Sequence, residues 1–151
     1  MTYPEAIVQS SLTEQFAPCR VDVKQDANAD IVRRYHQAWT PDFRVTNADG
    51  DDLYRWNGFL PPAEFAAQLL MAAGYARLAL GDAERSSLVL DDLTRRFPTS
   101  AYAAEGTYYG AVARFKVTKD RSDLSGDGCN DVLVRFSSGE FRAYRPAWVR
   151  R

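Results

Sequence analysis

Residues Trp39 to Trp56 read WTPDFRVTNADGDDLYRW and carry a clear signal of secondary structure. Apolar and polar residues alternate over 43–46 and again over 53–56, with the period of two residues that β-strands show. An Asp-Gly pair lies in the turn between the two runs, and in that position it is a strong hairpin signal. The stretch therefore predicts a β-hairpin.

Further elements are predicted on both sides of this hairpin. Residues 4–16 repeat an apolar side chain every four positions and begin with a proline, which predicts a helix. Residues 19–23 alternate apolar and polar side chains, which predicts a strand. A second helix is expected to end near Gln37, and a third follows Gly58 and buries Phe65, Leu69 and Leu70.

The second half of the chain has helical periodicity. The spacing of three and four residues predicts one helical face over 83–97 and another over 101–115. A faint repeat supports a helical unit: Leu90, Leu93, Arg96 and Phe97 recur 39 positions later as Cys129, Val132, Arg135 and Phe136. Repeats built from helix pairs have periods of roughly 34 to 47 residues. The repeat favours a further helix over 128–136.

The order of these elements resembles the thioredoxin fold. The matching residues are Val21-Asp22-Val23, Trp39-Thr40-Pro41, the hairpin 43–56, and Gly58 before the last helix. The resemblance implies a cis proline at Pro41, directly before a strand of the core. It also implies an α/β fold: an incomplete thioredoxin-like sheet unit over 1–73, followed by an α-helical hairpin extension over 74–151 that is similar to tetratricopeptide repeats.

The chain departs from that family at its N-terminus. Thioredoxins begin with a strand and a Cys-x-x-Cys motif, and both are missing here. The motif works because a helix N-terminus stabilises the attacking thiolate. Cys19 follows the first helix instead, and we expect it to be a small core residue. Without the first strand, the chain is a fragment, borrows a strand from a partner, or pairs 19–23 directly with 43–46.

Composition excludes several classes of function. The 151 residues are 46 % apolar and 26 % charged, as in globular domains, and no apolar run is long enough to cross a membrane. The net charge of −1 argues against nucleic-acid binding. Two cysteines 110 positions apart exclude a disulfide framework and a structural zinc site. The N-terminus carries no signal-peptide pattern, so we expect a cytoplasmic protein.

One loop carries a weak calcium pattern. Asp123, Ser125, Asp127 and Asp131 place oxygen ligands at positions 1, 3, 5 and 9 of a calcium loop, with a glycine at position 6. Position 12 is Val134, where such loops have a bidentate glutamate. In this interpretation residues 132–136 and 141 form a hairpin that resembles FG-GAP propeller repeats. The alternative, which we favour, is a turn followed by the helix over 128–136.

The remaining candidates have simpler interpretations. The acidic stretch 47–52 is expected to be the hairpin turn, and His36 a surface or helix-end histidine. The aromatic residues of the last helical face are expected to belong mainly to the core, although a surplus on one face would form a peptide groove. These residues are Tyr102, Tyr108, Tyr109 and Phe115. The C-terminal arginines are expected to be solvated.

We therefore expect a non-catalytic, thioredoxin-like protein-interaction or scaffold domain without a cofactor. The first alternative is a truncated member of a thiol-disulfide oxidoreductase lineage whose missing N-terminus carried the redox motif. The second alternative is a calcium-binding module through residues 123–131. A homodimer through an unpaired sheet edge is the expected partnership, with no nucleic acid and no membrane.

Overall fold

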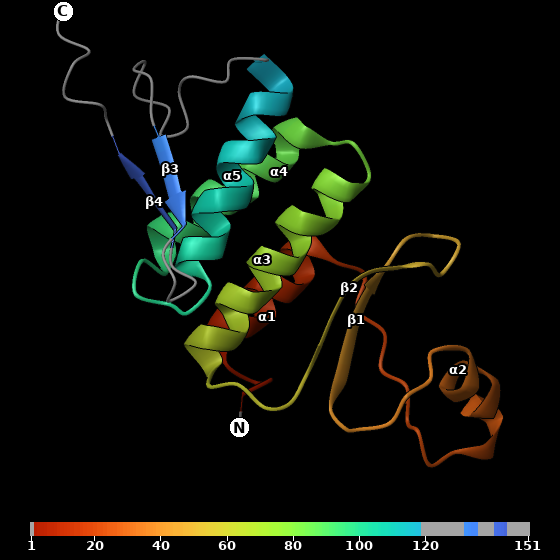
Figure 1. Cartoon of the computed structure of the whole chain (residues 1–151). Helices are drawn as coiled ribbons and strands as arrows, with labels where there is room; N and C mark the ends of the chain where they lie inside the picture. Colours follow the sequence, from red (N-terminus) through yellow and green to blue (C-terminus); the bar gives the residue numbers. More distant parts are fainter. Residues whose placement is uncertain (1, 119–131, 136–140, 145–151) are drawn as a thin grey trace, which may run out of the picture.

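The computed structural model describes residues 2–118 and the backbone of 132–135 and 141–144. Within these residues the fold is mixed α/β, with two antiparallel hairpins and five α-helices (Figure 1). The elements in order are α1 (Ala6–Gln15), the 3₁₀-helix η1 (Asp26–Asn28), α2 (Ala29–Arg34), β1 (Asp42–Thr46), β2 (Asp52–Asn57), α3 (Pro62–Ala79), α4 (Ala83–Arg96), α5 (Ala103–Thr118), β3 (Val132–Arg135) and β4 (Phe141–Tyr144).

Helix α3 is the centre of the molecule. It packs against α1, the first hairpin, α4 and α5, so most of its residues are buried, Phe65, Leu69 and Leu70 among them as predicted. Because every face is covered, the helix is apolar all round rather than amphipathic. It runs unbroken through residues 73 and 74, where the sequence suggested a boundary between two units.

Close packing joins α3 to α4. Gly74 lies against Leu90, so near that an added Cβ would meet the Leu90 Cγ and Cδ2 atoms at 2.5 Å. The buried Ser86 hydroxyl donates a 2.7 Å hydrogen bond to the Gly74 carbonyl. Asp82 caps the start of α4 by accepting from the Arg85 amide. The predicted helices over 83–97 and 101–115 are confirmed as α4 and α5.

The predicted hairpin is confirmed as β1 and β2. Phe43 pairs with Trp56 and Val45 with Tyr54, so these four side chains share one face of the hairpin. Three of them, Phe43, Tyr54 and Trp56, pack on the core around α3. Gly50 lies in the turn at φ +82°, a conformation that favours glycine.

The opposite face of the hairpin is polar and is joined to the α2 segment. Arg44 bonds to Asp42, to Asp52 and to the Tyr35 carbonyl. The Arg44 guanidinium also lies 5.1 Å from the centre of the Tyr35 ring, a cation–π distance. The Tyr35 hydroxyl donates to the Gly50 carbonyl at 2.9 Å. The hairpin thus lies between α3 and the α2 segment (Figure 1).

The strand predicted over 19–23 is wrong. These residues form no strand, and β1 pairs only with β2 in the described part of the chain. Alternation alone misled here, because a strand also needs a neighbour to take its backbone hydrogen bonds. The expectation that Cys19 is a core residue is also wrong, since Cys19 is exposed. Of the three outcomes proposed for a missing first strand, direct pairing of 19–23 with 43–46 is therefore wrong.

The helix predicted over 128–136 is wrong at residues 132–135. They form β3, which pairs antiparallel with β4 in the register Val132–Tyr144 to Arg135–Phe141. The 39-residue repeat therefore aligns a helix, α4, with a strand, and the region 74–151 is not helical throughout. β-branched residues at 132 and 134 favour the strand. The hairpin alternative is the one that the structure supports. The calcium candidates Asp123, Ser125, Asp127 and Asp131 lie outside the described residues.

Candidate functional site

Three residues singled out by the resemblance, Trp39, Pro41 and Gly58, lie at the open end of the first hairpin. We call these three residues and Phe59 the hairpin base. The Gly58 amide donates a 3.0 Å hydrogen bond to the Pro41 carbonyl and so closes this end. The Thr40–Pro41 peptide bond is cis, the isomer that the resemblance implied. Trp39 precedes this closure and Phe59 follows it, so two segments 20 positions apart converge.

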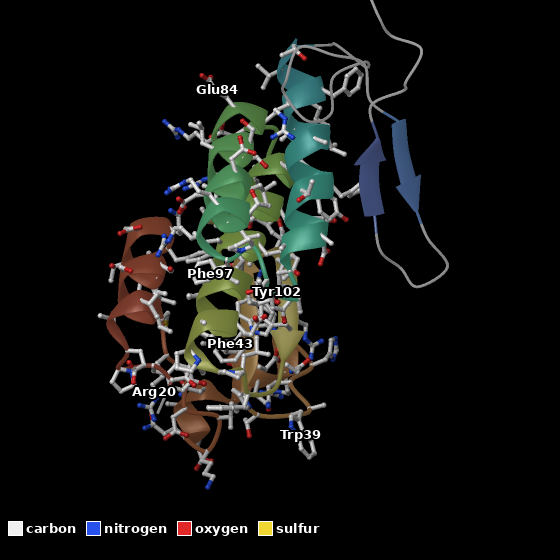
Figure 2. All side chains as sticks on the ribbon, turned by 90° about the vertical axis from the view of Figure 1, so that its left-hand side faces the viewer. Arg20, Trp39, Phe43, Glu84, Phe97 and Tyr102 are labelled. Atoms are coloured by element: carbon white, nitrogen blue, oxygen red, sulfur yellow. The ribbon has the colours of Figure 1, made fainter. Side chains whose placement is uncertain are left out.

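Both aromatic side chains of the hairpin base face solvent. Trp39 is 70 % exposed and Phe59 is 68 % exposed, the two largest exposed fractions among the described large apolar side chains. Trp39 lies at the end of the molecule opposite Glu84 (Figure 2). Leaving an aromatic ring in water costs hydration free energy, and aromatic side chains are enriched in protein interfaces.

A polar frame holds the hairpin base in place. The Asp42 side chain is 6 % exposed and accepts from Arg44 at 3.1 Å and from Arg55 at 3.1 Å. Asp42 directly follows Pro41, so this carboxylate fixes the strand ends where the exposed rings begin. The Gln37 side chain donates to the Trp39 carbonyl at 2.6 Å. The bonds between Asp42 and the two arginines are charge-assisted, and such bonds are strong and directional. They hold the ends of the two strands next to the exposed rings.

A second polar region, the tyrosine face, lies between β2, α3 and α5 (Tyr54, Gln68, Tyr102, Glu105 and Tyr109). Tyr102 lies directly before α5, and Glu105 and Tyr109 lie within it. Spacings of three and four residues bring the three side chains to the same side of the helix. Gln68, 2 % exposed, donates to the Tyr54 hydroxyl at 3.1 Å. The Tyr54 and Tyr109 rings both meet Tyr75 edge to face, at 5.4 and 5.0 Å.

Burial governs the titration of the tyrosine face. Loss of solvent raises the pKa of Glu105 above its usual value of 4.5. Burial also raises the pKa values of Tyr54, Tyr102 and Tyr109, with the negative charge of Glu105 as a further cause. No ion pair reaches Glu105 from any described residue. The face is therefore electronegative and has no cation of its own among residues 2–118.

The aromatic candidates near α5, His36 and the acidic turn have clear positions in the structure. Tyr102 and Tyr109 pack against the core, so the core interpretation is confirmed for them. His36 is exposed just after α2, as expected. In the acidic turn, the Asn47 side chain accepts from the amides of Asp49 and Asp51 at 3.0 and 2.8 Å, which is the geometry of a structural turn.

Sequence reasoning missed Phe59 and Glu105. Phe59 was hidden by its neighbours, because an apolar residue between Gly58 and Leu60 looks like the start of a buried helix. Glu105 had a usable signal, since it lies three residues after Tyr102 and four before Tyr109. That spacing places a carboxylate between two tyrosines on one helical face.

The described residues contain no group of three histidine, cysteine or carboxylate side chains that would hold a metal ion. No helix of the described part is long and apolar enough to cross a membrane. No protein-family model, no curated protein and no solved structure matches the chain.

Proposed function

We propose that the chain is a non-catalytic protein-interaction domain that contacts its partner through the hairpin base. The observation that carries this proposal is the exposure of Trp39 and Phe59 on a closed, well-held backbone. Aromatic side chains dominate the energetics of protein interfaces, because they bury a large area with few rotatable bonds. The polar frame around Asp42 limits the ordering that binding requires, which favours affinity.

The proposal includes a relationship to the thioredoxin fold, which is supported by the order of the elements. Its support is the order of α1, the hairpin and α3, with cis Pro41 before β1 and Gly58 after β2. The missing strand at 19–23 weighs against it. The interaction role does not depend on this relationship, because it rests on exposed side chains.

The partner that we propose is a second copy of the chain. Each strand of a two-stranded sheet keeps one edge whose backbone groups have no partner within that sheet, and such edges invite pairing. A two-fold axis that passes beside the hairpin base would bring the two hairpin bases together, since an isologous interface uses the same patch twice. Trp39 and Phe59 of both copies would then be covered.

Sedimentation velocity across a hundredfold range of concentration tests this proposal. We expect a monomer–dimer equilibrium in the wild-type protein and at least a tenfold weaker dimer in Trp39→Ser with Phe59→Ser. Leu88→Ser is the matched control, because Leu88 is 66 % exposed but lies on α4. That variant should dimerise like the wild type. A wild-type protein that stays monomeric, or a double variant that dimerises normally, would overturn the proposal.

A second candidate function, which differs from the truncated lineage considered from the sequence, is thiol-disulfide exchange at Cys19. Cys19 is exposed, and it is the one free cysteine of the described residues. Thiol exchange needs an accessible thiolate, so exposure is the observation that favours this activity. An insulin-reduction assay with dithiothreitol decides between the two. We expect no acceleration over dithiothreitol alone; turnover that Cys19→Ser abolishes would show that the domain is catalytic.

A further inference from the structure

A groove lies at the turn end of the first hairpin, far from the hairpin base along both strands. It is a groove of about 260 Å³ between the end of α1, the hairpin and the C-terminal half of α3. Its α3 wall consists of Ala73, Ala76, Arg77 and Leu80, which share one helical face. The other walls are Gln15, Phe16 and Ala17 from the end of α1, and Val45, Thr46 and Leu53 from the hairpin.

The groove is apolar with a single cation. Most of its lining side chains are aliphatic or aromatic, and Arg77 is its one charged residue. The Arg77 guanidinium donates a 2.8 Å hydrogen bond to the Gln15 side-chain oxygen, which is a neutral partner. No carboxylate among residues 2–118 forms an ion pair with Arg77. This half-buried positive charge is therefore balanced by no described side chain.

The position of Arg77 in α3 favours a positive charge, but it does not account for the guanidinium N–H groups that Gln15 leaves without a bond. It lies in the last turn of α3, where helix carbonyls favour a cation. A guanidinium has five N–H donors in a planar fork, and Gln15 occupies one edge of it at most. The remaining donors suit a carboxylate, which accepts two parallel hydrogen bonds from arginine.

We propose that this groove binds a small monocarboxylate with an apolar tail, the carboxylate on Arg77 and the tail between α3 and the hairpin. The groove volume of about 260 Å³ lies below the range of about 300 to 1,000 Å³ that drug-sized ligands occupy, so the ligand must be smaller than those. Charge complementarity selects an anion, and the aliphatic walls select the tail. Phe16 from the end of α1 and Leu53 from the hairpin contribute apolar walls for the tail, while Leu80, 60 % exposed, lies at the rim.

Isothermal titration calorimetry with octanoate as the probe tests this inference. We expect saturable one-to-one binding of octanoate at millimolar concentration or below. Octanol lacks the charge and acetate lacks the tail, so each should bind at least about tenfold more weakly. Equal binding of octanoate and octanol would contradict the role of Arg77. No binding of octanoate at about 10 mM would contradict the whole site.

Variants locate the binding at the groove. Arg77→Gln keeps a side chain that hydrogen-bonds to Gln15 and should weaken octanoate binding about tenfold or more. Arg85→Gln is the matched control, since Arg85 is an exposed arginine on α4, and it should bind octanoate normally. Thr46→Tyr adds a ring at the exposed rim and should also reduce binding. Normal binding by Arg77→Gln would overturn the proposal, provided that its circular dichroism spectrum is unchanged.

Discussion

The helical core and the first hairpin are stabilised by different interactions. Helices α3, α4 and α5 meet through small and aliphatic residues, with Leu90 and Leu93 fully buried against glycines of the neighbouring helices. The hairpin meets α3 through aromatic rings, and its other face is held by an arginine–aspartate network. The stability of the core therefore depends on steric fit between helices, whereas the stability of the hairpin depends on charge pairing. This contrast teaches where substitutions will unfold the chain and where they will disturb only one region.

The largest effect is expected at Asp42. Asp42→Ala removes a 6 % exposed carboxylate and leaves Arg44, 12 % exposed, with less compensation. Breaking a buried ion pair in this way costs about 3 kcal/mol of the free energy of unfolding. Urea unfolding followed by circular dichroism measures the loss. Asp30→Ala is the matched control, because Asp30 and Arg33 form an exposed pair, and it should cost about 0.5 kcal/mol or less. Equal losses in both variants would show that charge pairing does not hold the hairpin.

Two glycine substitutions test the fit between the helices. Gly74→Ala places a Cβ at 2.5 Å from Leu90 atoms and should destabilise the protein by about 2 kcal/mol. Gly110→Ala meets its nearest atoms at 3.5 Å, an ordinary contact, and should stabilise the helix by up to about 1 kcal/mol. The same urea experiment measures both values. A stabilised Gly74→Ala protein would show that Leu90 can move to make room for the added methyl group, and that steric fit does not determine the stability of the core.

A smaller effect is expected at the tyrosine face, where the core and the hairpin meet. Burial raises the pKa of Glu105, so the folded state favours its protonated form. The resulting stability is present at pH values below 4.5, the ordinary pKa, and is lost as the pH rises through the folded-state pKa. Glu105→Gln removes this dependence. The unfolding free energy of the wild type minus that of the variant should therefore fall as the pH rises from 4 to 7. A rise in this value would contradict the assignment.

The local sequence pattern was sufficient to predict an element where the residues of that element alone determine its structure. Alternation around an Asp-Gly pair predicted β1 and β2, and helical spacing predicted α3, α4 and α5. In each case the same residues that set the pattern also make the buried contacts, as Phe65 and Leu90 do. The polar turn at Asn47 followed from turn chemistry alone.

Pattern was insufficient where the outcome depended on distant partners. Residues 19–23 alternate like a strand, but no neighbouring strand takes their backbone groups. Residues 132–135 repeat the spacing of a helix yet pair with β4 instead. The groove at Arg77 is assembled from α1, the hairpin and α3, so its residues are neighbours only after folding.

Hydrogen exchange measured by mass spectrometry at low and high protein concentration tests the proposed interface most directly. We expect slower exchange at high concentration in peptides covering residues 39–46 and 52–59, with no change in α4. The Trp39→Ser and Phe59→Ser double variant should show no such protection. Exchange that is independent of concentration, or protection confined to α4 or α5, would contradict an interaction through the hairpin base.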